Sequence, residues 1–333
     1  RLELAEIRIS AAPLDDWQAA AGELIELAEN ALDHGALRYA RQGYQLASYL
    51  RWVHGQCGEA LSDSLQGERV TRSGTDREQV VGMAEAAKCL ALLERDLPRA
   101  DAMILEAQAL AARQGYHCAA IPTCLGILRY YEGQWDRACE QLMEARALCK
   151  SQGDRVSEFL ANEYLALTET ERGDFHQAAR HCRAMRAIGE RLREGSEAPL
   201  ADAMSGLCHY VLEGAHEGLD EACDRLRVVD AKQRLTYVLN RVARQDIRNS
   251  RWSDAERRST EALSLAQTME LPTESLLACL NLAEIKRHHL GTGALAEDPL
   301  LERMRSLCRS TVGASARKRA AKLMHQVTDE AKP

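Results

Sequence analysis

The chain has 333 residues, of which 46% are hydrophobic, and a formal net charge of −7. Its richness in Ala, Leu, Glu and Arg, with only 7 Pro and 2 Phe, favours helices over strands, and no apolar run reaches the roughly 18–20 residues of a membrane span. The 11 cysteines include no C-x-x-C pair, which argues against a secreted disulfide framework and a zinc ribbon, so we expect reduced thiols in the core of a cytoplasmic protein.

The first segment, residues 1–34, is predicted to precede and cap the rest of the fold. The sequence begins without a methionine, so we expect it to be an excised part of a longer protein. Residues 14–34 read LDDWQAAAGELIELAENALDH and predict a helix, because Trp17, Leu24 and Leu27 lie roughly on one face.

The segment from residue 35 to residue 291 repeats itself with a period near 40 residues. In the clearest copy, YYEGQWDRACEQLMEARAL, Gly133 is followed by Trp135, Ala138 and Ala145. A glycine can end one helix, and small residues on the next helix let two antiparallel helices approach closely. Related copies are anchored 36 to 41 residues apart at Gly55, Arg95, Gly173, the degenerate Gly214, and Ser250. Each copy predicts a helical hairpin that must stack on its neighbours to bury its apolar stripe.

The pattern L-G…G-x-W-x-x-A…A at 125–145 resembles the tetratricopeptide repeat. The longer period resembles the repeats of large bacterial signal-transduction ATPases and transcription regulators. The resemblance implies an all-α fold, a right-handed α-solenoid of about six antiparallel helix pairs over residues 35–291. It also implies a regulatory place in a larger bacterial protein.

Residues 292–333 predict two further helices, which are basic and would cap the array, form a tail or mediate an oligomer. Lys and Arg outnumber Asp and Glu by 20 to 13 in residues 225–333, whereas residues 1–224 hold 23 against 37. The second part could therefore favour an anionic partner. No helix-turn-helix pattern adjoins the basic run at 316–322, so we do not expect direct nucleic-acid contact.

Catalytic signatures are missing from the sequence. It contains no phosphate-binding glycine loop, no H-E-x-x-H motif and no G-x-S-x-G elbow. His288 and His289 are adjacent, and neighbours on a helix point about 100° apart, which makes them a poor chelating pair. We therefore expect no catalytic residues, no cofactor and no metal, and we do not expect an enzyme.

Candidate binding residues follow from the repeat register. In the tetratricopeptide family the first helix of each pair lines a concave groove, and counting back from each anchor places residues on that surface. The predicted groove is aromatic and apolar early on and rich in arginine late, which suits an acidic peptide or an acidic domain surface. Its residues are Tyr49, Trp52, Glu85, Tyr130, Glu163, Tyr237, Asn240, Arg244, Arg248, Glu284 and Arg287.

Two functions fit these expectations. The first is a non-catalytic interaction or scaffold module that binds a peptide or a protein domain in the groove. The alternative is an effector-sensing domain in which a small molecule or signal peptide shifts the superhelix between two shapes. The alternative predicts a local pocket with convergent polar groups instead of a continuous groove. A standalone enzyme is the weakest reading, because it would need clustered acids and bases.

Overall fold

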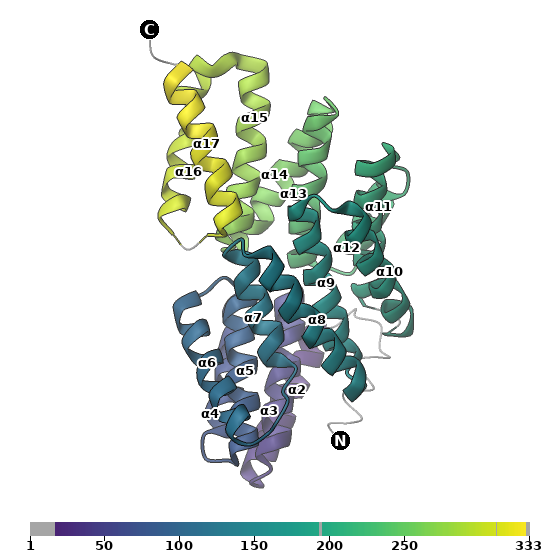
Figure 1. Ribbon diagram of the computed structural model, residues 1–333, viewed down its shortest axis with the longest axis vertical. Helices are drawn as coiled ribbons and strands as arrows, with labels where there is room; N and C mark the ends of the chain where they lie inside the picture. The colour runs from purple at the N-terminus through teal and green to yellow at the C-terminus, as the bar shows by residue number, and fades with distance from the viewer. Residues whose placement is uncertain (1–16, 193–194, 311, 331–333) are drawn as a thin grey trace.

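The computed structural model describes residues 17–192, 195–310 and 312–330, and every regular element in these ranges is an α-helix (Figure 1). The predictions for residues 1–16 and for the last three residues fall outside the described part. The helices are α2 (Trp17–Asp33), α3 (Leu37–Val53), α4 (Cys57–Thr71), α5 (Asp76–Leu92), α6 (Leu97–Arg113), α7 (Ala120–Tyr131), α8 (Trp135–Gln152), α9 (Arg155–Arg172), α10 (Phe175–Leu192), α11 (Glu197–Glu213), α12 (Leu219–Val228), α13 (Lys232–Arg248), α14 (Trp252–Thr268), α15 (Pro272–Ala296), α16 (Pro299–Arg309) and α17 (Ala314–Glu330).

Successive helices pack as antiparallel pairs, from α3 with α4 to α13 with α14. The first helices of most successive pairs also touch each other: α5 contacts α7, for example, and α13 contacts α15. Together the first helices form the inner layer. The second helices of the pairs lie outside this layer. This arrangement is the all-α solenoid that the sequence predicted.

Left-handed residues end the first helix of each repeat, as predicted. Gly55, Gly133 and Gly173 have φ of 81°, 73° and 86°, a conformation that glycine adopts without steric cost. One anchor is corrected by a single residue: the left-handed position after α5 is Glu94, with φ of 53°, and not Arg95. The loop between α5 and α6 is one residue longer than those after α3, α7 and α13, so counting back from Leu97 places the anchor one residue late.

The small residues of the repeat lie where helices meet. The alanines at the first small position of α4, α6, α8, α10 and α14 are all fully buried. Gly126 on α7 shows why size matters: a Cβ built there would lie 2.5 Å from Cγ of Leu142 on α8. The repeat therefore encodes close helix contacts, as expected from its spacing.

The solenoid curls until its second half touches its first half. Helix α13 contacts α3, and the loop after α3 meets the loop before α13, where His54 Nδ1 lies 3.0 Å from the backbone oxygen of Asp230. The loop after α5 is joined to the start of α15, since Arg95 Nη2 lies 2.7 Å from Glu270 Oε2. This closure determines which parts of the inner layer stay open.

Each end of the described chain has its own apolar packing. Helix α2 packs on α3, and Trp17 stacks on His54 with ring centroids 4.3 Å apart. Helices α15, α16 and α17 share a second core cluster that includes Leu280 and Leu323. The division at residues 34 and 291 stays a prediction. No helix in the described ranges is both long and apolar enough to cross a membrane.

Candidate functional site

The predicted groove residues on α3, α9 and α13 lie in the inner layer, but most of them are buried against other side chains of the protein. Trp52, Glu163, Tyr237 and Asn240 are each at most 3% exposed, and Tyr49 is partly buried. In this conformation a partner could reach them only if the layer opened. Their role in binding therefore stays a prediction.

Arg234 on α13 is the centre of the first buried cluster. Its side chain is fully buried and lies 2.9 Å from Glu163 Oε2 and 2.8 Å from Glu197 Oε1. The guanidinium carbon also lies 5.1 Å from the ring centre of Phe159 and 5.7 Å from that of Trp52. Two carboxylates and two aromatic faces thus compensate one buried cation.

Two tyrosines complete this cluster. The Tyr49 hydroxyl donates to Glu197 (2.8 Å) and accepts from Arg234 (3.1 Å), while the Tyr237 hydroxyl donates to Glu163 (2.6 Å). Burial raises the pKa of Tyr49 and of Tyr237, so both hydroxyls stay protonated. The cluster joins α3, α9, α11 and α13, and it closes the first half of the inner layer.

Arg241, two turns further along α13, forms a second cluster. It lies 3.1 Å from Glu171 Oε1 and 3.1 Å from Glu274 Oε1, and it donates to the Tyr130 hydroxyl at 2.8 Å. Asn240 donates to the same Glu274 carboxylate at 2.7 Å. The predicted residues Tyr130 and Asn240 are therefore neighbours, but both are engaged within the protein.

Beyond Arg241, a cavity of about 190 Å³ lies between α9, α11 and α13. Arg244 and Arg248, both predicted as groove residues, line it together with Glu171 and Arg172. We call the surface formed by Arg244, Arg248 and the neighbouring Arg319 of α17 the basic cleft. In this cleft Arg248 is exposed, and Arg244 and Arg319 are partly exposed.

Positive charge exceeds negative charge in the basic cleft. Arg244 lies 4.0 Å from Glu171, whose other oxygen pairs with Arg241. Burial, followed by the positive charge of Arg319, lowers the pKa of Arg244 to about 10, and Arg248 acts in the same direction. Within the described ranges, no ion pair or hydrogen bond holds the side chain of Arg248 or Arg319. An added anion would relieve this repulsion.

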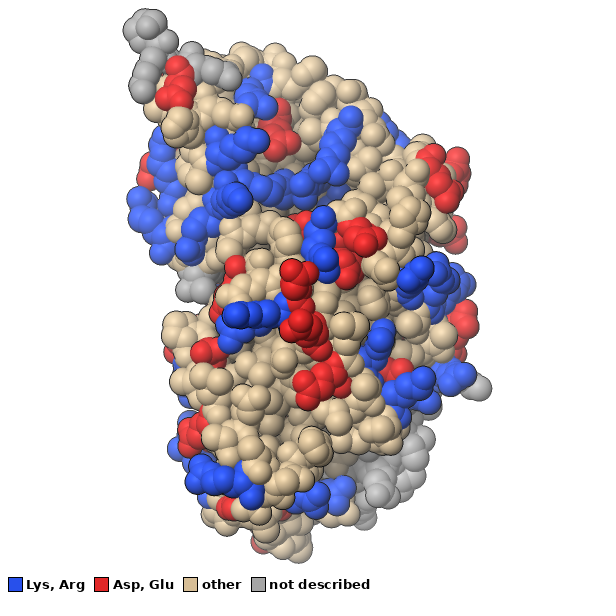
Figure 2. Space-filling view, viewed as in Figure 1, with Lys and Arg blue, Asp and Glu red and all other residues tan. Residues whose placement is uncertain are grey.

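Figure 2 shows this imbalance on the molecular surface: basic side chains gather over α13 to α17, and an acidic strip lies below them over α7 to α9. Glu284 of α15 also acts on the basic cleft, because its charge is opposite to that of Arg244 and Arg319.

The other two predicted groove residues make contacts outside the basic cleft. Arg287 donates to Gln326 of α17 at 3.3 Å. Glu85 pairs with Lys88 at 2.6 Å in the first half.

Sequence reasoning missed the two arginines that organise the inner layer. Arg234, Arg241 and Arg248 are spaced seven residues apart, which places them on one face of α13, and this spacing could have identified them. Arg319 was seen only as part of a basic run. Its position beside Arg244 depends on how α17 folds back on α15, which no local pattern shows.

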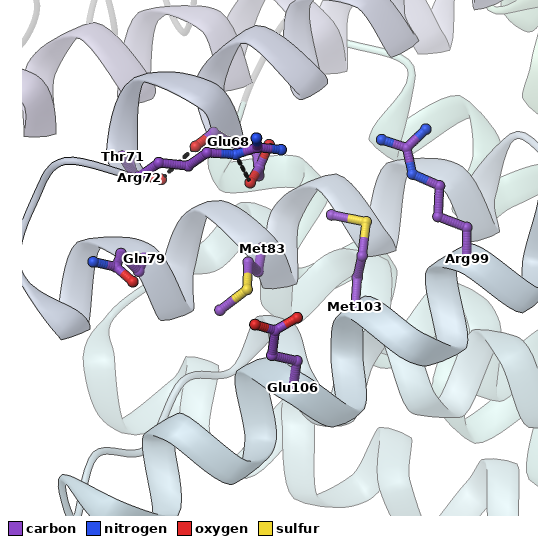
Figure 3. A pocket seen from close by; sticks show the side chains of 8 residues that line it. All are labelled: Glu68, Thr71, Arg72, Gln79, Met83, Arg99, Met103 and Glu106. Carbon is purple, nitrogen blue, oxygen red and sulfur yellow. Dashed lines mark hydrogen bonds and ion pairs between the residues drawn. The ribbon is translucent and has the colours of Figure 1, made fainter.

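A second, larger cavity of about 320 Å³ opens on the outer side between α4, α5 and α6 (Figure 3). Met83 and Met103 face the same space, and Glu106 points up between them. Arg72 is already paired with Glu68 through contacts of 2.8 and 2.9 Å. None of the predicted groove residues lines this cavity. Among the described residues, no group of His, Cys, Asp or Glu has the arrangement of a metal site.

No protein-family model and no curated protein sequence matches the chain. Among solved structures, the fold is similar to the apo form of the quorum sensor NprR from B. thuringiensis, with 11% identity, a TM-score of 0.49, and coverage of 96% of this chain and 100% of the other. It is also similar to yeast Tom70, with 11% identity, a TM-score of 0.23, and coverage of 94% and 96%. A circular tandem repeat protein matches with 15% identity, a TM-score of 0.20, and coverage of 99% and 82%. The solenoid assignment rests on the packing of the helices described above.

Proposed function

We propose that this chain is a non-catalytic interaction module that binds an acidic peptide, or an acidic segment of a protein domain, in the basic cleft. The observation that carries the proposal is the surplus of arginine there. Arg244, Arg248 and Arg319 come from two helices that are far apart in sequence. Two carboxylates act on them, those of Glu171 and Glu284, and Glu171 also pairs with Arg241. Guanidinium groups suit carboxylates because they offer forked, planar donors.

The form of the surface favours a chain-like partner over a compact ligand. The basic cleft lies along the last two turns of α13 and reaches α17, so its cations follow one another along a surface on which Arg248 is exposed and Arg244 and Arg319 are partly buried. An extended peptide can place several carboxylates along such a row. The regulatory setting suggested by the repeat resemblance, within a larger bacterial signalling or transcription regulator, is part of the proposal and rests on the repeat length alone.

A peptide-binding measurement tests the proposal. A fluorescent peptide of about ten residues, rich in Asp and Glu, is titrated with the protein and with the double variant Arg244→Glu, Arg248→Glu. We expect the variant to bind at least about tenfold more weakly, because each lost charge-assisted hydrogen bond contributes about 1.5–3 kcal/mol. Added salt should weaken binding to the unmodified protein.

The matched control reverses two arginines on the outer helix α10, Arg180→Glu with Arg183→Glu, which changes the net charge equally. Both residues are exposed. The control should bind the peptide almost as well as the unmodified protein. Equal losses in the two double variants would show that only net charge matters, and unchanged binding in the Arg244, Arg248 variant would refute the proposal.

A further inference from the structure

Helices α9 and α11 are the exception in the inner layer, because they hardly touch each other although α10 packs against both. The Arg234 cluster joins them near Glu163 and Glu197. Towards their carboxyl ends they stay apart, and the cavity of about 190 Å³ that adjoins the basic cleft lies there. We call this opening, which Phe175 and Val211 line among others, the α9–α11 gap.

The α9–α11 gap is large enough for a side chain from a partner. A water molecule needs about 10–15 Å³ of such a cavity. The gap therefore has room for roughly a dozen water-sized groups, which is more than a leucine side chain requires.

Part of the gap wall is apolar and reachable. Phe175 at the start of α10 and Val211 on α11 are both partly exposed, and both pack against the main core from the side of the gap. An apolar group placed between them would remove their exposed surface from water, which is favourable in proportion to the area covered.

Most polar groups of the lining already have partners within the protein. Thr170 donates to a backbone oxygen of its own helix at 2.8 Å. Arg172 lies 3.3 Å from Asp136 and 3.4 Å from Glu169, and Gln245 is only 8% exposed. Apart from the arginines of the basic cleft, the gap thus offers a polar ligand little to bind.

The charges at the gap favour an uncharged side chain inside it. Glu171 lines the gap, and its carboxylate lies 3.1 Å from Arg241 and 4.0 Å from Arg244. A second carboxylate inserted there would compete with Glu171 for the same two arginines. Arg248 is exposed and Arg319 does not line the gap, so acidic groups are better placed along the cleft than within the gap.

We propose that the α9–α11 gap takes a bulky aliphatic side chain, such as leucine, from the acidic peptide. This inference rests on the proposed function, because the basic cleft would hold the carboxylates next to that side chain. An extended peptide advances about 3.3 Å per residue and turns successive side chains to opposite sides. One peptide can therefore fill the gap with one residue and meet the arginines with its neighbours. The partner is then an acidic segment that contains an aliphatic residue, and not a purely acidic one.

Two peptides of equal charge test the inference. Each has about ten residues, roughly 33 Å when extended, is rich in Asp and Glu, and carries either leucine or alanine at its centre. Fluorescence anisotropy measures their affinities. We expect the leucine peptide to bind about tenfold more tightly, because leucine buries more apolar surface than alanine.

Variants at Val211 locate the leucine. Val211→Trp should reduce the preference for leucine to less than about twofold by filling the gap, while the alanine peptide still binds through the arginines and shows that the cleft is folded. Val211→Ser should also lower the preference, because it removes part of the apolar wall without adding volume. The matched control is Leu212→Trp, since Leu212 is 39% exposed and does not line the gap. It should keep the preference.

Equal affinity of the two peptides for the unmodified protein would overturn this inference and leave the acidic-peptide proposal intact. The same holds for a leucine preference that survives both Val211 variants, or one that Leu212→Trp also removes. Failure of the proposed function looks different: neither peptide binds, or Arg244→Glu with Arg248→Glu leaves the binding of both unchanged. Either of those results would overturn both proposals.

Discussion

Gly126 lies where α7 meets α8, and the structure leaves no room for a side chain there. The alanine variant would place its methyl group within 2.8 Å of two carbons of Leu142. We expect Gly126→Ala to lower the free energy of unfolding by about 1–2 kcal/mol, since overpacking outweighs the gain in helix propensity. Urea unfolding measures this change.

Gly22 on α2 is the matched control, because a Cβ added there meets no atom within 4 Å. Gly22→Ala should raise the free energy of unfolding by about 0.5–1 kcal/mol. If both alanine variants change the free energy of unfolding in the same direction, close packing of α7 against α8 is not the reason for a glycine at position 126.

The free energy of unfolding should depend on pH through the buried carboxyl of Glu94. Burial raises the pKa of its carboxyl from 4.5 to about 8, with Glu274 acting in the same direction, while Thr273 and Arg95 oppose it. Between pH 4.5 and about pH 8, the Glu94 carboxyl therefore stays protonated in the folded protein but is ionised in the unfolded chain. The stability from Glu94 is therefore complete below pH 4.5 and falls as pH rises through about 8, by at most about 1.4 kcal/mol per pH unit.

Glu94→Gln should flatten this part of the stability profile, because glutamine does not ionise and can still accept from the backbone N–H of Thr273, which lies 3.0 Å from Glu94. Urea unfolding from pH 5 to pH 8.5 measures it, with Glu140→Gln on the exposed face of α8 as the control. An unchanged pH profile in Glu94→Gln would mean that the buried carboxyl does not titrate in this window.

At the scale of single residues, the sequence predicted what depends on local geometry. The left-handed glycines and the buried small residues follow from the repeat and lie where expected. The shift from Arg95 to Glu94 could not be seen, because it comes from one extra residue in the loop between α5 and α6 and no glycine marks the left-handed position there.

At the scale of helices, the Arg234 cluster holds α13 against α3, α9 and α11. Arg234→Met would leave Glu163 and Glu197 buried without their counter-charge. We expect it to lower the free energy of unfolding by about 3–5 kcal/mol, measured by urea unfolding. The control is Arg305→Met on α16, whose pair with Glu302 is exposed and should contribute less than about 1 kcal/mol. A similar small effect of both variants would contradict a joining role for Arg234.

The helix pairs themselves were predictable, because their signals lie within about 40 residues of one another. The contacts that join the pairs into a closed layer were not. The hydrogen bond from Tyr49 to Glu197 spans 148 residues, and the one from Arg234 to Tyr49 spans 185. The repeat register predicted Tyr49, Trp52, Glu163 and Tyr237 as groove residues, but it could not show that they pack around Arg234.

At the scale of the whole molecule, curling of the solenoid divides the inner surface into two unequal parts. The first half is largely occupied by its own buried charges and aromatic rings. The second half exposes the basic cleft, where α17 brings Arg319 next to the arginines of α13. The sequence predicted a groove that is aromatic early and basic late. In the structure the aromatic part is filled by internal contacts, and the basic part has partly exposed arginines.

Hydrogen–deuterium exchange with and without the acidic peptide tests this division most directly. We predict that the peptide slows exchange at the end of α13, around residues 241–248, and at the start of α17, around residues 314–322. Residues 45–52 of α3 and the outer helices α4, α6 and α8 should exchange as before. Protection confined to the outer helices or to α3, with none at α13 and α17, would contradict the account.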